Sequence, residues 1–546
     1  MKRIRISGGI VYDGGGGEPF AADVVLADGV VEAIAPPGAA ASGAEESIDA
    51  AGLAVAPGFI DSHSHADWVL PEAEHPEILR PLLLQGVTTS VGGNCGFSPF
   101  PVSESTAGQV LEQSRFLTNG EFAFQWRDQS EYLDYLDGKG LCCNLATLAG
   151  HGPMRTAIKG ASPEPLTEAE RKRLGCMLED AFRRGAYGVS LGLSYVPGIF
   201  ADDAEVETVF RAAAVADVVV AIHGRTYSRV SPCYPVTPGH RAHYLQDLEY
   251  FLGMAAKTGA KLHISHVLLK GSETWGIWPD VLRLFDEAAD SGIDVTFGVI
   301  PYHWGNTLIT TLFPKWFLED FAGNIAKPDR VGRLEREVAE TERTIGRKFS
   351  DLFLLWGVTP ALEALEGKSF SEIAAELGCE GIEACLHVAK ESGGRAKILT
   401  AAYSGEEFFF PEPLERLLAH PLSMVEIDTI LTSSSGPQNP ASFGALPKWL
   451  GRYARERGLV SLPDAVRRIT GAPADRFRLQ GRGYLRPGYA ADVVVFDPAA
   501  IRDENSIREP TLPPTGIAHV IMNGRPQIRQ GMFCARGLSG QTLRRV

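Results

Sequence analysis

The sequence predicts an α/β protein, a (β/α)8 TIM barrel with a small β-sandwich domain built from both termini and a helical insertion after strand 7. Three observations predict this fold. Apolar strand-like runs alternate with helical patterns through the middle of the 546-residue chain. Short β-type runs occur at both ends. The interval between the last two predicted barrel strands is too long for an unstructured loop.

The two ends of the chain have the same character. RIRISGGIVYD and ADVVLADGVVEAIA near the N-terminus, and GYAADVVVFDP and IAHVIMNGRPQIRQGMF near the C-terminus, are apolar runs broken by Gly and Asp. Such runs are typical of short strands joined by tight turns. We therefore expect residues 1–56 and 482–546 to form one β-sandwich, with the barrel over residues 57–481.

The segment TEAERKRLGCMLEDAFRRG shows the clearest helical pattern. Thr167 and Glu170 match a capping box, and Gly185 suits the left-handed position that ends a helix. The apolar stripe of this helix consists of Leu174, Met177, Leu178, Ala181 and Phe182. The predicted strands are LAVAPGFID, TTSVGGN, CNLATLAG, GVSLGL, VVVAIH, KLHISH, DVTFGVIP and MVEID. This alternation indicates a parallel sheet covered by helices.

The insertion is expected at about residues 305–420. It contains the helical pattern KPDRVGRLEREVAETERTI and several aromatic clusters. A loop of this length inside a compact domain is normally folded. We expect a folded insertion in a position to cover the active-site face of the barrel.

Composition excludes several classes of protein. The net charge is -15, from 52 Lys+Arg and 67 Asp+Glu, and no long basic run occurs, which argues against nucleic acid or an anionic membrane as partner. We find no signal peptide, and no apolar run approaches the roughly 20 residues of a membrane span. The eight cysteines are scattered, which favours a reduced, cytoplasmic protein. The sequence does not indicate an oligomeric state.

Nearly every predicted barrel strand ends in a residue able to bind metal or substrate. In chain order these residues are His63 and His65, Cys95, His151, Tyr195, His223, His266, Tyr302 and Asp428. Because the C-terminal ends of barrel strands meet at one mouth, we expect their side chains to converge. Alternation along a strand directs His63 and His65 to the same side. Imidazole nitrogen and thiolate sulfur are preferred zinc donors, and a carboxylate can complete the set.

Each of these residues also has a purely structural interpretation. Cys95 could be a small buried apolar residue, and His151 or His223 could bond to backbone at a strand end. Asp428 could cap a turn, and the two tyrosines could be packing residues. We interpret the remaining cysteines as structural. The occurrence of N, S and O donors at successive strand ends favours a metal site over these separate explanations.

Five motifs resemble a known family. PGFIDSHSH, GVTTSVGGNCG, GHGPMR, ISH and RPGYAADVVVFDP, in this order and nearly from end to end, resemble the amidohydrolase superfamily and specifically the D-aminoacylase (N-acyl-D-amino-acid deacylase) family. GNCG is the more specific motif, because most relatives with two metals use a carboxylated Lys after strand four. That region here reads GVSLGLSYVPG and offers no Lys, whereas Cys95 is available.

The resemblance implies a zinc-dependent enzyme that hydrolyses a linear N-acyl amide in a small-molecule substrate. The metal ligands that it implies are Cys95, His223 and His266 for a tightly bound Zn²⁺, and His63 and His65, with Cys95 shared, for a second and weaker site. The other residues that it implies are Asp428 as general acid/base, His151 and Tyr195 at the scissile carbonyl or substrate, and Arg225 and Tyr302 as substrate-binding groups. It also implies that the insertion resembles a lid.

Three departures from the family pattern concern the substrate. After the strand-five His, the chain reads HGRTYS, which keeps Arg225 but lacks the family's acidic pair. Near the end of the barrel the family has an Arg that binds the substrate carboxylate, and the corresponding stretch here, NPASFGALP, has no Arg. Around the acidic residue that ends strand eight, the family usually reads Ser-Asp-Gly, whereas this chain reads EIDTI. A bidentate Arg–carboxylate contact is hard to replace. The substrate therefore either lacks a free carboxylate or is bound by Arg225 or another basic group.

Two other functions are compatible with the fold. A cyclic amide hydrolase of the hydantoinase or dihydroorotase kind would share the barrel, but the missing strand-four Lys and the GNCG motif argue against it. A catalytically silent binding protein would keep the fold and a metal. The complete donor set with Asp428 argues against that interpretation, and turnover of any amide would exclude it.

Overall fold

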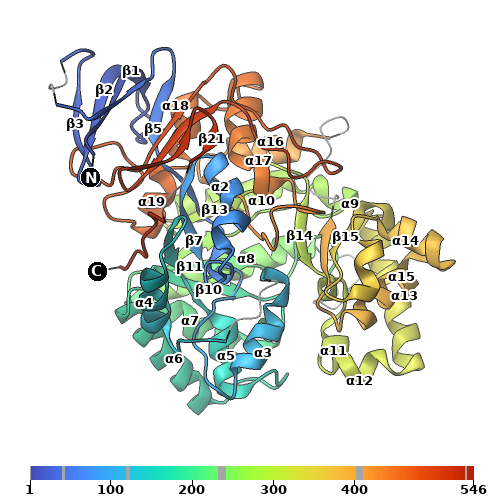
Figure 1. The fold of residues 1–546 in the computed structure, drawn as a ribbon. Coiled ribbons are helices and arrows are strands. Elements are labelled where there is room, and N and C mark those ends of the chain that lie inside the picture. Colours follow the sequence, from blue (N-terminus) through green and yellow to red (C-terminus); the bar gives the residue numbers. More distant parts are fainter. Residues whose placement is uncertain are drawn as a thin grey trace.

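The structure is a computed structural model that describes residues 2–39, 43–118, 123–231, 241–400, 410–534 and 538–545. Its centre is a set of short parallel strands flanked by helices (Figure 1). These strands are β6 (Phe59–Asp61), β7 (Val87–Gly92), β8 (Asn144–Thr147), β9 (Ala149–Gly150), β10 (Gly188–Gly192), β11 (Val219–His223), β12 (Lys261–Ile264), β13 (Val295–Val299) and β17 (Ser423–Val425). Each overlaps a run that the sequence predicts as a strand.

The parallel strands pair nearly in chain order. One sheet has the order β6-β7-β8 and the other the order β17-β13-β12-β11-β10-β9. Leu148, between β8 and β9, donates its N–H to Gly92 O at 2.9 Å and so links the two sheets. Ser64 forms a parallel bridge with Thr429, just beyond the ends of β6 and β17. The first and last strands of the series therefore meet at their C-terminal ends.

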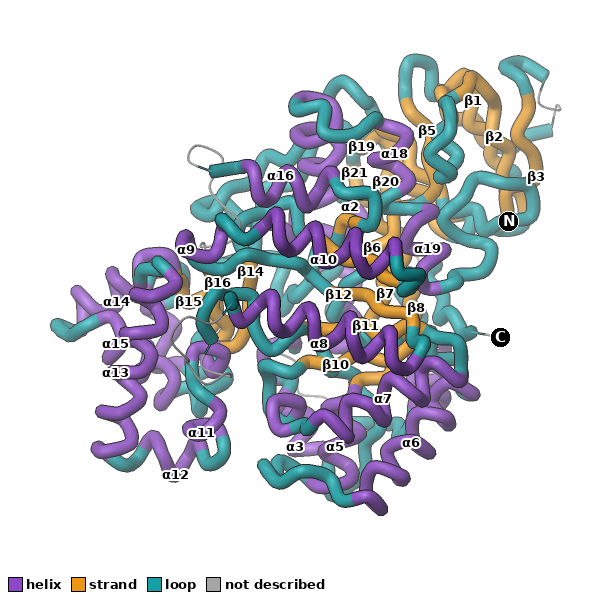
Figure 2. Tube along the Cα trace, turned by 180° about the vertical axis from the view of Figure 1, so that it is seen from behind, coloured by secondary structure: helices purple, strands orange, loops and turns teal. Residues whose placement is uncertain are grey.

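Helices follow the strands and lie outside them, as the view from behind shows (Figure 2). They include α1 (His75–Ile78), α2 (Arg80–Leu84), α3 (Ala107–Gln113), α4 (Gln129–Lys139), α5 (His151–Lys159), α6 (Glu168–Arg183), α7 (Asp203–Val215), α8 (His243–Thr258), α9 (Ser272–Trp275), α10 (Trp278–Asp290), α16 (Glu412–Ala419), α17 (Ala441–Lys448), α18 (Leu462–Arg467) and α19 (Gly471–Phe477). The predicted capping box of α6 is present between Thr167 and Glu170, and Gly185 after it has a φ of 104°.

The insertion contains a sheet as well as the predicted helices. Its strands β14 (Gly305–Leu308), β16 (Lys397–Thr400) and β15 (Leu352–Trp356) are antiparallel and paired in that order. Its helices are α11 (Lys315–Leu318), α12 (Phe321–Ile325), α13 (Pro328–Ile345), α14 (Phe370–Leu377) and α15 (Gly381–Glu391). The sequence does not predict this sheet, because its strands are too short to show a clear alternation. Residues 401–409, at the end of the predicted insertion, lie outside the described residues.

The insertion has a hydrophobic core of its own. Leu334, Leu354, Phe370 and Val388 are buried in a cluster that also includes Phe200, from the loop after β10. The insertion therefore packs on a loop that follows one of the parallel strands. Figure 1 shows its helices α11–α15 gathered on one side of the molecule.

Both termini contribute to a single sheet. Its described strands are β1 (Ile4–Val11), β2 (Phe20–Ala27), β3 (Val30–Ala35), β4 (Glu46–Asp49), β5 (Ala54–Pro57), β18 (Val493–Phe496), β19 (Ile517–Met522), β20 (Arg525–Arg529) and β21 (Met532–Phe533). The order is β21-β20-β19-β18-β5-β1-β2-β3, with β4 beside β1. The two ends of the chain join where β18 pairs antiparallel with β5, with Val494 opposite Ala56.

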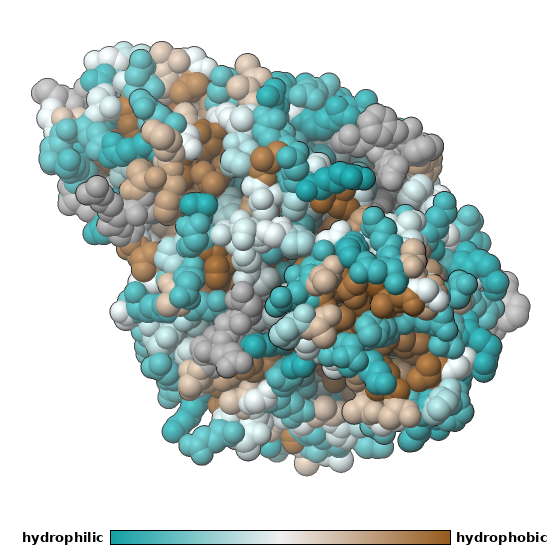
Figure 3. All heavy atoms as spheres, turned by 45° about the vertical axis from the view of Figure 1, so that its right-hand side comes forward, coloured by the Kyte–Doolittle hydropathy of each residue, from teal (hydrophilic) through white to brown (hydrophobic). Residues whose placement is uncertain are grey.

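Hydrophilic side chains occupy much of the face that Figure 3 shows, with apolar side chains gathered mainly on the side where the insertion comes forward. Within the described part of the chain, no helix combines the length and the apolar character needed to cross a bilayer.

Candidate active site

Cys95 lies in a strained loop after β7. Its φ is 52° and that of the following Gly96 is 76°, both in the left-handed region that non-glycine residues seldom adopt. Gly96 N donates to Ser190 Oγ at 2.9 Å, and Gly96 O accepts from Gly152 N at 2.9 Å. These bonds hold the loop in the conformation that brings the buried Cys95 thiol to the ends of β11 and β12. A strained backbone of this kind is typical of functional sites.

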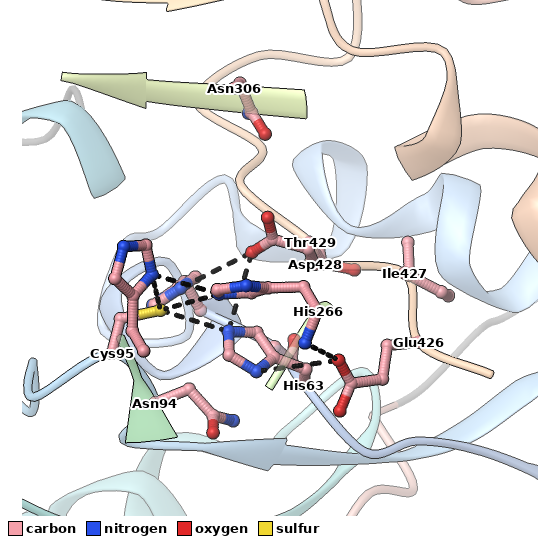
Figure 4. A network of polar contacts seen from close by, with 12 residues as sticks. His63, Asn94, Cys95, His266, Asn306, Glu426, Ile427, Asp428 and Thr429 are labelled. Atoms are coloured by element: carbon pink, nitrogen blue, oxygen red, sulfur yellow. Dashed lines mark hydrogen bonds and ion pairs between the residues drawn. The ribbon is translucent and has the colours of Figure 1, made fainter. Parts of the chain in front are cut away.

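Three donor atoms form a tight triangle at this point. Cys95 Sγ lies 3.4 Å from His223 Nδ1 and 3.4 Å from His266 Nε2, and the two nitrogens are 3.0 Å apart (Figure 4). In a tetrahedral site with typical Zn–N and Zn–S bonds, donor atoms stand about 3.3–3.6 Å apart. The three residues are buried, and their donor atoms converge on one point. The triangle therefore fits a zinc ion.

A second group of donors shares Cys95. His63 Nε2 lies 3.2 Å from Cys95 Sγ, and the donors of His63, His65 and Cys95 are all within 4.8 Å of one another. Asp428 Oδ1 lies 3.6 Å from His63 Nε2 and 3.7 Å from His65 Nε2. The structure thus brings together all five residues that the sequence predicts as metal ligands, with Asp428 beside them.

Asp428 and His266 repeat the backbone strain of Cys95. Their φ angles are 55° and 34°. Asp428 Oδ1 is buried and accepts no hydrogen bond from the described residues. A buried carboxylate oxygen without a donor is unusual, and such an atom normally meets water, an ion or a ligand.

Sequence reasoning missed two groups that contact the predicted metal ligands. Glu426 is fully buried, and its Oε2 accepts from His266 N at 2.9 Å while its Oε1 lies 2.8 Å from His263 Nε2. Glu426 Oε2 also lies 4.0 Å from His63 Nδ1. Ser194 Oγ lies 2.8 Å from His223 Nε2, the ring nitrogen that faces away from Cys95. Partners of this kind fix the orientation of ligating imidazoles. An acidic residue two positions before Asp428 was the available signal for Glu426.

Asp61 joins the first and last strands beneath the site. Its Oδ1 accepts from the backbone N–H of His63 and of Ile427, and its Oδ2 accepts from Thr429 Oγ1 at 2.8 Å. The carboxylate therefore connects the His63 backbone with the segment that carries Asp428. Burial raises the pKa of Asp61 to about 7 and that of Glu426 to about 8.

Burial also shifts the pKa values of the predicted ligands themselves. It lowers the pKa of His65 and of His266 to about 3, which keeps these imidazoles neutral with a lone pair available. Burial, with the nearby carboxylates Asp428 and Glu426, raises the pKa of the Cys95 thiol well above its usual value. A thiol in this position becomes a thiolate when a cation binds, so metal binding releases a proton here.

The donors open into a cavity with a mixed lining. Its polar and charged lining residues are His65, Cys95, Ser194, Tyr195, His223, Arg225, Thr226, Tyr227, Ser228, Ser231, His266, Lys270, Asn306, Thr307, Thr311, Thr341, Glu342, Arg347 and Asp428, and its apolar ones are Phe116, Val230, Leu268, Leu312, Phe313, Ile345 and Ile430. Several of them belong to the insertion, which therefore forms one wall of the cavity, as expected of a segment that covers the site.

Tyr195 and Arg225 lie in the cavity wall, as their predicted roles require. Tyr195 Oη is 2.9 Å from Thr307 Oγ1, on β14 of the insertion. Arg225 Nη1 donates to Asp247 Oδ1 at 3.1 Å, and the guanidinium carbon lies 4.3 Å from the centre of the Tyr250 ring. The charge of Arg225 is therefore compensated inside the protein. Lys270, which sequence reasoning did not consider, also lines the cavity, and its charge contributes to the low pKa of His223 and His266.

The structure does not bring Tyr302 or His151 into this cavity lining. Tyr302 Oη donates to Asp503 Oδ2 at 2.7 Å, in the segment after β18, and Lys448 Nζ lies 4.1 Å from its ring centre. His151 begins α5, where its Nε2 lies 2.7 Å from the buried carboxylate of Glu205. A position at a strand end determines where the Cα lies but not the direction of the side chain, which in both cases follows a carboxylate partner.

We expect Glu426→Gln to weaken zinc binding by about 10–100-fold, the usual cost of losing a partner that orients metal ligands. The substitution keeps the size of the side chain but replaces one of the two oxygens that face His63, His263 and the His266 backbone with an NH₂ group. Competition with a chromophoric chelator measures the zinc affinity. An unchanged affinity would show that Glu426 has no influence on the metal ligands.

Gly192→Ala should displace the Cys95 loop. A Cβ at Gly192 would collide with the backbone carbonyl of Cys95, whereas a Cβ at Gly175, in α6, meets only Thr208 Cγ2 at 4.0 Å. We expect Gly192→Ala to cost about 1–3 kcal/mol of unfolding free energy and to lower zinc content. Gly175→Ala is the matched control and should retain zinc. Metal analysis with denaturant unfolding tests this, and full zinc content in Gly192→Ala would contradict it.

The comparisons with known proteins agree with this geometry. A model of the Amidohydrolase family matches residues 46–320 and 363–528. The chain is 30% identical to an N-acyl-D-glutamate deacylase of Alcaligenes xylosoxydans xylosoxydans over 95% of this chain and 92% of the relative. It is 29% identical to a D-aminoacylase of the same organism, over 100% of this chain and 98% of the relative.

A solved structure matches along the whole chain. It is an N-acyl-D-glutamate deacylase from Bordetella bronchiseptica in complex with zinc and a phosphonate inhibitor, a mimic of the tetrahedral intermediate of the reaction. Its TM-score is 0.80 at 30% identity, covering 100% of this chain and 99% of the other.

The chain thus belongs to the amidohydrolase family. Its most similar relatives include D-aminoacylases and N-acyl-D-amino-acid deacylases, which confirms the resemblance that the motifs indicate.

Proposed function

We propose that this protein is a zinc-dependent hydrolase that cleaves a linear N-acyl amide in a small molecule, as D-aminoacylases do. The observation that carries the proposal is the buried triangle of Cys95, His223 and His266, with donor separations of 3.0–3.4 Å, next to Asp428 and open to a cavity. The relatives, named as deacylases of N-acyl-D-amino acids, support the same reaction.

The residues of the triangle would hold the tightly bound zinc, and His63 and His65, with Cys95 shared, would hold a second ion more weakly. When bound, zinc supplies Lewis-acid polarisation of a carbonyl and lowers the pKa of water to about 7. Glu426 and Ser194 keep the ligand rings in place, as their hydrogen bonds to His266 N and toward His223 Nε2 indicate. The neutral imidazoles leave their lone pairs available for the metal.

Asp428 is the proposed general acid/base. Its Oδ1 stands beside His63 and His65 and accepts no hydrogen bond from the described residues, so it is available to a proton of the attacking water. The same oxygen then delivers the proton to the leaving nitrogen of the amide. Asp428 has a left-handed φ of 55°, and its carboxylate stands next to the proposed metal donors His63 and His65.

The cavity favours a substrate with one apolar part. Leu268, Leu312, Phe313 and Ile430 line it together with the polar residues. Tyr195, held by Thr307 of the insertion, is the proposed contact to the substrate near the scissile bond. Arg225 is the proposed wall residue beside it, but its pairing with Asp247 makes it a weak substitute for a carboxylate-binding Arg.

We further infer that the parallel strands close into one (β/α)8 barrel, spanning residues 57–481. The Leu148–Gly92 bond and the Ser64–Thr429 bridge support closure at both junctions. The sheet that joins β5 and β18 supports a β-sandwich domain from residues 1–56 and 482–546. In this arrangement the insertion, at about residues 305–420, stands over the C-terminal ends of the strands.

Release of free amine tests the function. The zinc-loaded protein is incubated with N-acetyl derivatives of D- and L-amino acids that have apolar side chains, together with the corresponding carboxamides, and with cyclic hydantoins. We expect turnover of at least one linear amide and none of the hydantoins. Turnover of hydantoins alone would replace the proposal with a cyclic amide hydrolase, and turnover of nothing would favour a silent binding protein.

A further inference from the structure

Asn306 lines the cavity and carries a hydrogen-bond donor that has no partner among the described residues. It lies on β14 of the insertion, is 5% exposed, and lines the same cavity as Cys95 and Asp428. Its Nδ2 is buried and has no partner among the described residues. Buried amide groups are nearly always paired, so an unpaired one that faces a cavity indicates a partner supplied by a ligand.

The orientation of this amide is determined by its neighbours. Asn439 Oδ1 accepts from the backbone N–H of Ala441 at 3.1 Å, so the other end of that amide, Nδ2, must donate. It donates to Asn306 Oδ1 at 3.1 Å. Since Oδ1 of Asn306 is the acceptor in this bond, its NH₂ group is the part that remains for the cavity. Asn439 is 1% exposed, so the pair is held rigidly.

The guanidinium groups in the cavity wall are engaged by carboxylates. Arg225 pairs with Asp247, and Arg347 forms a two-point contact with Glu342 on the insertion. The Asn306 amide is neutral, by contrast, and its Nδ2 has no partner among the described residues. It is therefore suited to an oxygen acceptor, whether that oxygen belongs to a carboxamide or to a carboxylate.

The location of Asn306 indicates which part of a substrate it meets. Figure 4 shows Asn306 on the Asp428 side of the site, across from Cys95 and His63. The metal donors place the scissile carbonyl, and Asp428 serves the leaving nitrogen. The amine half of the substrate therefore extends toward Asn306.

We propose that Asn306 is a specificity-determining residue. Its Nδ2 donates a hydrogen bond to an oxygen of the carboxamide or carboxylate group that is attached to the same carbon as the scissile nitrogen. This inference rests on the proposed function, because that function orients the substrate. It predicts that the protein distinguishes substrates with this oxygen from an otherwise identical amide that lacks it.

Three probes and three proteins test the inference. The probes are N-acetyl-leucine, N-acetyl-leucinamide and N-(3-methylbutyl)acetamide, which has the same acetamide but lacks the carboxyl or carboxamide group; the chiral probes are used as both enantiomers. The proteins are wild type, Asn306→Ala and Asn306→Asp, all zinc-loaded. Calorimetry gives binding constants for probes that are not turned over, and amine release gives kcat and KM for those that are. Asn306→Asp keeps the size and the acceptor of the Asn439 bond, so it remains informative if Asn306→Ala does not fold.

In Asn306→Ala, affinity for the acid and the carboxamide should fall about tenfold, as expected for one lost hydrogen bond, with KM rising and kcat little changed. Affinity for the third probe should not change. In Asn306→Asp, affinity for N-acetyl-leucine should fall more than affinity for N-acetyl-leucinamide. The new carboxylate repels the carboxylate of the acid, whereas it can accept a hydrogen bond from the NH₂ group of the carboxamide. Asn324, a buried insertion residue whose Nδ2 bonds to Trp316 O and Phe317 O, provides the control. Asn324→Ala should affect stability but not this preference.

Equal losses for all three probes would overturn the inference, since they would indicate a general structural effect. Unchanged discrimination in both variants, or no binding of any probe to wild type, would overturn it too. Altered discrimination in binding without any turnover by wild type would support the role of Asn306 while rejecting the proposed hydrolysis. Turnover by wild type with the same discrimination in the Asn306 variants would support the proposed hydrolysis and reject the role of Asn306.

Discussion

Asp428→Asn is expected to lower kcat for amide hydrolysis by about 10²–10⁴-fold, the range in which a general acid/base contributes. The substitution preserves shape but removes the group that takes a proton from water and delivers it to the leaving nitrogen. Zinc content should stay at the wild-type level, because Cys95, His223 and His266 are untouched. Steady-state kinetics and metal analysis on the same preparation provide the measurement.

Asp23→Asn is a suitable control for that variant. Asp23 is 1% exposed and pairs with Arg5 in the terminal sheet, far along the chain from the metal donors. Its replacement should lower stability without changing kcat. If Asp428→Asn kept near wild-type turnover, Asp428 would lose its role as acid/base and another group would have to move the proton.

Cys95→Ala is expected to abolish both zinc binding and activity. Cys95 is the one residue shared by the two donor groups, so its loss removes a ligand from each. We expect occupancy below about one tenth of wild type at equal zinc, since loss of a ligand exceeds the 10–100-fold effect of losing a supporting partner. Elemental analysis after dialysis against buffered zinc measures occupancy.

Cys385→Ala separates this effect from a general cost of removing a buried thiol. Cys385 is fully buried on α15 of the insertion, away from the donors. The control should retain zinc and turnover at a modest cost in stability. Wild-type zinc occupancy in Cys95→Ala would show that Cys95 is not a ligand and would remove the basis of the proposed centre.

The strand ends were the part of the site that sequence could predict. Parallel strands bring their C-terminal ends together, so His63, Cys95 and His266 could be placed near one another from the order of the apolar runs alone. The side chains of Tyr302 and His151 are turned toward the carboxylates of Asp503 and Glu205, which come from distant segments. No local pattern reveals such partners, and the structure places both side chains away from the cavity.

The supporting groups were harder to predict for a related reason. Glu426 acts through the backbone of His266 and the ring of His263, and Asn306 is oriented by Asn439, 133 positions later in the chain. Neither residue carries a motif. The sheet of the insertion escaped prediction as well, because β14, β15 and β16 are short and take their register from one another.

Zinc titration of metal-free protein, with amine release followed at each addition, tests the central claim most directly. The proposed centre predicts no amine release without metal. The rate of amine release should rise linearly with added zinc and level off near one zinc per chain, because the Cys95–His223–His266 triangle is the site that fills first. Full turnover by the metal-free protein would contradict the account, and so would stoichiometric zinc binding that leaves every linear N-acyl amide intact.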